Sequence, residues 1–245
     1  MSAPIRFAGR SAFTLVELLT VIAIIGVLAA ILIPTVAKMR KTAHAAGCTV
    51  ALRQIGAATA LFAGEHKGKA PIGDSGANGG NGHWYIQIAP YLGVTFPEGL
   101  NTTEKMRLKG TPASCRLAPQ AGGDVQAIGA SYGWTAVPIV SGMPYLQNGP
   151  FLNQIPQPAR TIMISERWGQ NSGGNRDTNW AVSPPYVRTA LDTDDPLTTN
   201  APGALRLSHG GRAHFLFFDG HVAAHLPSET YDDSDLSTGN LWRGL

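Results

Sequence analysis

The sequence predicts an α+β protein in which one long amino-terminal helix packs on an antiparallel β-sheet. An apolar run over residues 13–33 is followed by apolar residues at three- and four-residue steps as far as Glu65, which is typical of a continuous helix. Two segments rich in branched residues, 131–140 and 161–166, predict strands. An Asp-Gly pair at 219–220, flanked by alternating apolar residues, predicts a β-hairpin.

The apolar run from Phe13 to Ile33 matches the ~20 residues that an α-helix needs to cross a bilayer core. Its one charged residue is Glu17. An ionisable residue inside a membrane span is costly and therefore indicates a function. Two plainer interpretations stay open: an ordinary secretory signal that is cut after Ala37, and a plain membrane anchor.

The residues around the start of this run are Ala12-Phe-Thr-Leu-Val-Glu17, behind a short polar leader with two arginines. This pattern resembles the type IV prepilin signal, which marks pilins and the pseudopilins of type II secretion. The resemblance implies that residues 1–12 are a leader, and that a membrane peptidase cuts between Ala12 and Phe13 and methylates the new amine. It also implies that Glu17 pairs with the amine of a neighbouring subunit's Phe13. Ala12 stands where the family usually has Gly.

Beyond the membrane run, the predicted helix of residues 13–66 carries two apolar stripes. One stripe contains Cys48, Leu52, Ile55 and Phe62. The roughly opposite stripe consists of Val36, Met39, Ala43, Ala46, Val50, Ala57 and Leu61. A helix with two apolar faces needs two partners. We expect one stripe to pack on the chain's own head, residues 67–245, and the other on neighbouring subunits; burial of the whole helix in one domain is the alternative.

A second family mark lies near the carboxyl terminus, where His209 is followed by nine residues and then by Asp219 and Gly220. This resembles the H-x9-DG element of one subgroup of pilin-like proteins, in which a string similar to residues 52–56 follows a helical cysteine. The resemblance implies a pilin-like head that ends in a hairpin over residues 209–226. His209 and Asp219 are expected either to contact each other or to cap loops.

A two-residue hairpin loop at residues 219–220 would place Phe218 opposite His221 and His214 opposite His225. One face would then hold three histidines, His214, His221 and His225. The other face would be apolar and pack on the long helix: Phe215, Phe217, Val222 and Ala224. Because His221 and His225 lie four residues apart on one strand, they are too distant to share a metal ion.

Other candidate sites are a disulfide and a cation loop. Cys48 and Cys115 are the two cysteines of the chain, and an exported head would permit a bond between them; two buried thiols are the alternative. Asp233 and Asp235 alternate in an oxygen-rich segment and form a weak Ca²⁺ candidate. A solvated acidic turn is the favoured interpretation of this segment, and no cofactor is predicted.

Composition and motifs argue against several classes of function. The net charge is only +3, which is too small an excess of basic residues to indicate nucleic-acid binding. No nucleophile elbow, zinc-protease helix or phosphate loop is present, and the sequence predicts no enzyme; Glu166, at the end of a predicted strand, is the one acid that invites attention.

The resemblance implies a structural subunit of a type IV pilus-like filament or a type II secretion pseudopilus. Its partners would be the prepilin peptidase/methyltransferase and other pilin-like subunits. The subunit would cross the inner membrane once, with its head in the periplasm or exterior. The alternative is a membrane-anchored or secreted binding domain, lectin-like or enzymatic, that never polymerises.

Overall fold

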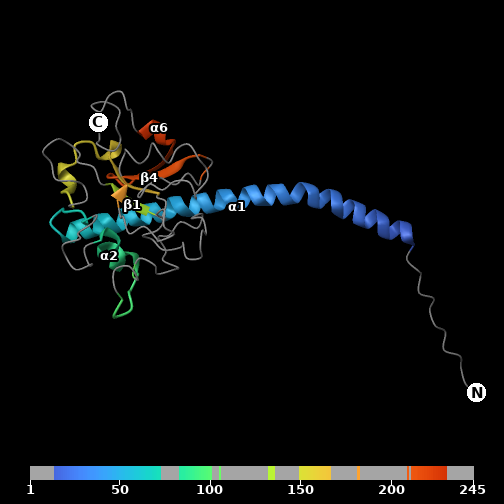
Figure 1. Cartoon of the computed structure of the whole chain (residues 1–245), viewed down its shortest axis with the longest axis horizontal. Coiled ribbons are helices and arrows are strands. Elements are labelled where there is room, and N and C mark those ends of the chain that lie inside the picture. Colours follow the sequence, from blue (N-terminus) through green and yellow to red (C-terminus); the bar gives the residue numbers. More distant parts are fainter. Residues whose placement is uncertain are drawn as a thin grey trace, which may run out of the picture. The chain divides into compact units, whose positions relative to one another are not determined.

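The computed structural model describes the following residues: 14–72, 83–100, 105, 132–135, 149–166, 181–182, 209 and 211–230. The chain divides into two compact units, Met1–Ala43 and His44–Leu245. Helix α1 (Leu15–Glu65) contributes to both units (Figure 1). The chain is therefore an α+β protein with a long apolar amino-terminal helix, as the sequence predicts.

In the first unit, α1 exposes nearly every side chain, including the large apolar ones from Leu15 to Ile33. By length and composition the helix can cross a membrane, and nothing in the described part of the chain buries its most apolar stretch. Pro34 lies inside the helix. Its position costs one backbone hydrogen bond, yet the helix continues without a break to Glu65.

Helix α1 ends because Lys67 adopts a left-handed conformation, with φ of 56°. The Gly68 N–H then donates a hydrogen bond of 2.7 Å to the carbonyl of Ala63. This is the Schellman arrangement, which satisfies a carbonyl that the helix leaves without a partner. The helix therefore stops at Glu65, and the chain changes direction at Lys67 and Gly68.

In the second unit, one face of α1 packs on the head. The predicted stripe of Cys48, Leu52, Ile55 and Phe62 is buried. Val50 and Leu61, from the opposite stripe, remain exposed. The prediction that one stripe packs on the chain's own head is thus confirmed for residues 44–65.

The second unit contains a five-stranded sheet in the order β3-β1-β2-β4-β5. The strands are β1 (Tyr132–Thr135), β2 (Ile162–Glu166), β3 (Ala181–Val182), β4 (Ala213–Phe217) and β5 (Val222–His225). β1–β2, β2–β4 and β4–β5 pair antiparallel, and the short β3 lies parallel to β1. The shorter elements are α2 (Trp84–Ile88), η1 (Ala89–Leu92), η3 (Leu152–Gln154), η4 (Pro158–Arg160) and α6 (Pro227–Thr230).

The core lies between α1, α2 and one face of the sheet. Aromatic side chains dominate it, because Trp84, Tyr85, Tyr132 and Trp134 are all almost completely buried. The rings of Trp84 and Trp134 lie 6.1 Å apart. Leu216 of β4 completes the cluster from the hairpin. Aromatic pairs at this distance stabilise the fold by more than the burial of their surface area alone would.

The hairpin forms as predicted, but its predicted register is wrong by one residue. Three residues, 218–220, connect the strands, because Phe217 N–H donates to His221 O at 3.0 Å. His214 consequently pairs with Ala224, and Ala213 pairs with His225. Gly220 has a φ of 90°, and it is the one residue of this loop with a positive φ. The predicted two-residue type I′ loop would need a positive φ at both Asp219 and Gly220.

This register exchanges the predicted faces of β4, whereas Val222 of β5 lies on the helix-facing side as predicted. Leu216 and Val222 pack on the core with α1. Phe215 and Phe217 are buried on the opposite face, where the Phe217 ring stacks on His221 at 4.2 Å. The predicted set of three histidines on one face is therefore wrong, since His214 lies on the helix-facing side.

Candidate functional site

The amino-terminal site is built by the first turn of α1. Thr14 N–H donates a hydrogen bond of 2.9 Å to the Glu17 carboxylate, and the Thr14 hydroxyl donates another of 2.8 Å. Glu17 N–H lies 3.3 Å from the same hydroxyl oxygen. This reciprocal arrangement is a capping box, in which the side chains of the first turn satisfy its unpaired amides. Glu17 is thus part of the helix start, independently of any partner subunit.

The sequence contains the signal for this cap, Thr14-x-x-Glu17, whereas the resemblance to the prepilin signal implies only the pairing role of Glu17. Ala12 and Phe13, the predicted processing residues, lie outside the described residues. The pairing of Glu17 with the amine of a neighbour's Phe13 therefore stays a prediction.

The second site is a buried cluster of Glu166, His209 and His214 in the head. Glu166 ends β2 and is completely buried. Its Oε1 lies 2.7 Å from Nε2 of His209, and its Oε2 accepts a 3.0 Å bond from the backbone N–H of His214. The His214 ring also approaches Oε1, at 3.4 Å for Nδ1.

Strand register explains how the sequence brings these residues together. β2 and β4 are antiparallel, and Ser165 pairs with Phe215. The next residues outward, Glu166 and His214, are therefore neighbours. His209 belongs to the segment just before β4, and its ring meets that of His214 edge to face at 4.0 Å.

The cluster stabilises a carboxylate in a place where water is excluded. An isolated buried carboxylate is costly, and hydrogen bonds to charged groups are stronger than neutral ones. His209 and His214 supply the donors here, so the cluster holds the end of β2 to β4 and to the His209 segment. Removing one member would leave a buried polar group without its partner.

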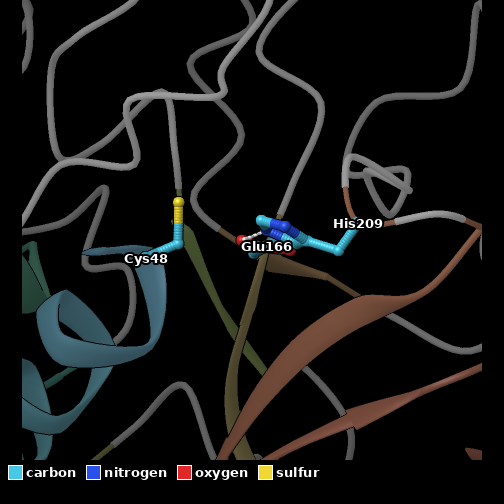
Figure 2. A group of neighbouring side chains, drawn as sticks. All are labelled: Cys48, Glu166 and His209. Carbon is cyan, nitrogen blue, oxygen red and sulfur yellow. Dashed lines mark hydrogen bonds and ion pairs between the residues drawn. The ribbon is translucent and has the colours of Figure 1, made fainter. Parts of the chain in front are cut away.

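Cys48 of α1 lies beside this cluster, as Figure 2 shows. Its sulfur, one carboxylate oxygen of Glu166 and one ring nitrogen of His209 all lie within 4.8 Å of one another. These residue types are ligands of Zn²⁺. Cys48, however, is disulfide-bonded, and a metal ligand must be a thiolate. In this oxidised state the group is a hydrogen-bonded cluster beside a disulfide rather than a set of three metal ligands.

The Cys48 backbone is also tied to the sheet, because the Tyr132 hydroxyl donates a 3.3 Å bond to its carbonyl oxygen. Cys115, the other cysteine of the chain, lies outside the described residues. So do Asp233 and Asp235, the weak Ca²⁺ candidates.

The H-x9-DG residues occupy two places rather than one. His209 contacts Glu166 in the buried cluster. Asp219 stays in its own loop, where its Oδ1 accepts a 3.1 Å bond from His221 N–H and lies 2.6 Å from Nδ1 of that ring. Asp219 therefore caps its own loop, as Asp often does in turns, whereas His209 contacts Glu166.

The two segments that resemble the pilin-like subgroup meet in space. A Cβ built on Gly56 would lie 3.1 Å from a methyl carbon of Leu216 and 3.8 Å from Cα of Gly220. The helix and the hairpin therefore approach most closely where α1 carries a glycine. Gly56 belongs to the string at residues 52–56, and Gly220 ends the H-x9-DG element.

The outer side of the hairpin carries a polar tie to α6. The Arg212 guanidinium donates to Ala224 O at 3.1 Å and to Glu229 at 3.1 and 3.3 Å. The Leu226 N–H bond to the carboxylate, supported by Arg212, lowers the pKa of Glu229 below its ordinary value.

Comparison with known proteins places the amino terminus in a recognised class. A model of the prokaryotic N-terminal methylation motif matches residues 8–33. The match supports a type IV pilin-like protein and implies processing by a prepilin peptidase and assembly with other pilin subunits. With the exposed apolar helix, it indicates a membrane-anchored protein of the cell envelope. No match was found among curated proteins or solved structures.

Proposed function

We propose that the chain is a structural subunit of a type IV pilus-like filament or a type II secretion pseudopilus. The methylation motif over residues 8–33 carries this proposal, because it coincides with the part of α1 whose large apolar side chains are exposed. In this role the leader is removed after Ala12, the helix anchors the subunit in the inner membrane, and the head lies on the periplasmic or exterior side.

The two faces of α1 support assembly through the helix. Its Cys48 face is covered by the head, whereas Val50 and Leu61 are exposed on the other face. An exposed apolar stripe of this kind favours contact with another apolar surface. Other pilin-like subunits supply such a surface through their own helices.

We propose a non-enzymatic, scaffolding role for the H-x9-DG element. Glu166, the acid that invites attention in the sequence, is completely buried and bonded to His209. That burial favours a structural role over contact with a substrate. The capped loop at Asp219 and the close approach at Gly56 would hold the hairpin against α1.

Mass spectrometry of the mature amino terminus tests the processing step. We expect a chain that begins with methylated Phe13. A chain that begins at Lys38 would instead indicate ordinary secretion, and an intact Met1 would indicate a plain anchor. Either result would overturn the proposal.

Assembly is tested by separating the charge of Glu17 from its capping role. Glu17→Gln removes the charge but keeps a hydrogen-bond acceptor, because glutamine also fits the third helical position of a capping box. Thr14→Val keeps the charge and removes the capping hydroxyl. We expect Glu17→Gln to enter the membrane and fail to join filaments, and Thr14→Val to assemble. Normal incorporation of Glu17→Gln would refute the pairing role.

A further inference from the structure

A cluster of cations follows the apolar part of α1. Lys38, Arg40 and Lys41 lie within four residues on the continuous helix, and all three side chains are exposed. We call this set the basic collar. At 3.6 residues per turn, Lys38, Arg40 and Lys41 lie at about 0°, 200° and 300° around the helix axis, so they occupy one broad side of the helix, about 160° wide, within a single turn.

The basic collar has no acidic neighbour on its own helix. No Asp or Glu occurs between Glu17 and Glu65. Charge pairs on a helix need partners three or four residues away, and none of those positions around the collar is acidic. The positive charge is therefore available to an external anion.

The position of the collar along the helix indicates which anion it meets. The stretch from Leu18 to Ala37 contains no charged residue. At ~1.5 Å per residue this stretch is ~30 Å long, which equals the ~30 Å thickness of a bilayer's hydrocarbon core. If residues 18–37 span the hydrocarbon core of the bilayer, Glu17 lies at one surface of that core and Lys38 at the other.

We propose that the basic collar is a binding surface for the phosphates of anionic lipid headgroups. Three cations within ~4.5 Å along a spanning helix fit a headgroup layer, because the lipid phosphates lie at one depth just outside the hydrocarbon core. Lys and Arg side chains that follow a membrane-spanning stretch reach into that layer while their stems stay along the apolar surface. The lipids would fix how deeply the unassembled subunit sits in the membrane.

This proposal shifts the span by a few residues from the predicted range of 13–33. It places Glu17, with its capping bonds to Thr14, at the membrane surface instead of within the core. The basic collar would bind lipid in the subunit before assembly. This binding would be the same whether the chain later enters a pilus or a pseudopilus.

The test uses the full chain reconstituted in phosphatidylcholine vesicles that contain either spin-labelled phosphatidylglycerol or spin-labelled phosphatidylcholine. Electron paramagnetic resonance measures the fraction of each labelled lipid that the protein immobilises. Each Lys or Arg near an anionic lipid surface raises the affinity of a protein segment for that surface by about fivefold. We therefore expect the wild-type chain to prefer phosphatidylglycerol by several-fold at low salt, and to lose the preference at high sodium chloride, because screening weakens exposed charges.

Two variants make the test specific to the collar. The triple change Lys38→Gln, Arg40→Gln and Lys41→Gln should bring the preference close to one. Arg53→Gln is the matched control, because Arg53 is an exposed cation on the same helix. It lies ~18 Å beyond Lys41 at ~1.5 Å per residue, about two Debye lengths at ordinary salt, and its loss should change nothing.

Several results would overturn the proposal. One is an unchanged preference in the triple variant, and another is an equal loss in Arg53→Gln. If sodium phosphate abolished the preference where sodium chloride of equal ionic strength did not, the collar would be a site for free phosphate. If labelled lipids showed no preference but the triple variant lost contact with other subunits, the collar would pair with acids of a neighbouring helix.

Discussion

Replacing Glu166 by Gln should destabilise the folded head because the buried cluster needs two acceptors at that position. The two carboxylate oxygens face His209 Nε2 and His214 N–H. Glutamine offers one oxygen and one NH₂ group. If its oxygen faces His214 N–H, its NH₂ group faces the His209 ring.

The His209 ring cannot absorb this change without a cost. Its Nε2 could accept from the new NH₂ group only if the ring proton moved to Nδ1. That atom is buried and has no hydrogen-bond partner among the described residues. One buried donor is therefore left unpaired in either tautomer, which costs about 1–3 kcal/mol. Glu166→Ala removes both acceptors and should cost more than Glu166→Gln, because it leaves two buried donors unpaired at about 1–3 kcal/mol each.

Tryptophan fluorescence during urea unfolding of the full chain measures this cost. Trp84 and Trp134 are buried in the same core and report its loss. Ser165→Ala is the matched control, since Ser165 is the preceding residue of β2, is completely buried, and has a hydroxyl without a partner in the described part of the chain. Its removal should leave the unfolding free energy within about 0.5 kcal/mol or raise it.

The reasoning fails if Glu166→Gln unfolds at the wild-type urea concentration with an unchanged slope. It also fails if Ser165→Ala costs as much as Glu166→Gln, because the loss would then reflect any change in β2 rather than the unpaired donor.

Two further changes probe other parts of the head. Reduction of the disulfide at Cys48 should lower the unfolding free energy by about 2–5 kcal/mol. Urea unfolding with and without a phosphine reductant measures this loss, and an unchanged midpoint would contradict the prediction. Glu229 has a lowered pKa, so its stabilising contribution is complete above the ordinary value of 4.5 and is lost as pH falls through the lower folded-state value. The stability difference between wild type and Glu229→Gln should therefore shrink in acid, and a difference that grew in acid would contradict this sign.

Periodic patterns made much of the fold predictable. The helix predicted over residues 13–66 is α1 over 15–65, because three- and four-residue apolar spacing persists along its length. The strand predicted at 161–166 is β2, which begins one residue later. The face of α1 that the head covers also follows from this spacing, since Cys48, Leu52 and Phe62 lie on it.

The hairpin shows where local patterns stop being sufficient. An Asp-Gly pair suits a two-residue loop with positive φ at both residues, and it equally suits a three-residue loop that needs positive φ only at the glycine. Among the described residues, Lys67 is the only residue other than glycine with positive φ. The chain thus avoids that conformation at Asp219. The resulting shift of one residue places the side chains of β4, but not those of β5, on the face opposite to the predicted one.

The buried cluster depends on contacts between distant parts of the chain. Glu166 and His209 are separated by 43 residues, and their contact depends on the pairing of β2 with β4. No local spacing encodes that pairing. The Thr14–Glu17 cap is the opposite case, because its spacing of three is itself the sequence signal for a capping box.

The close approach at Gly56 yields a prediction that couples the two family segments. Glycine inside a helix is about 1 kcal/mol less favourable than alanine, so Gly56→Ala should stabilise α1 if nothing opposed it. The new Cβ would lie 3.1 Å from a methyl carbon of the fully buried Leu216, and overpacking of a core costs about 1–3 kcal/mol. We expect Gly56→Ala to be destabilising, and Leu216→Val to relieve part of that cost in the double variant. Urea unfolding of the four chains gives the coupling energy, expected at about 0.5–3 kcal/mol. Additive effects of the two changes would mean that the helix and the hairpin do not meet at this point.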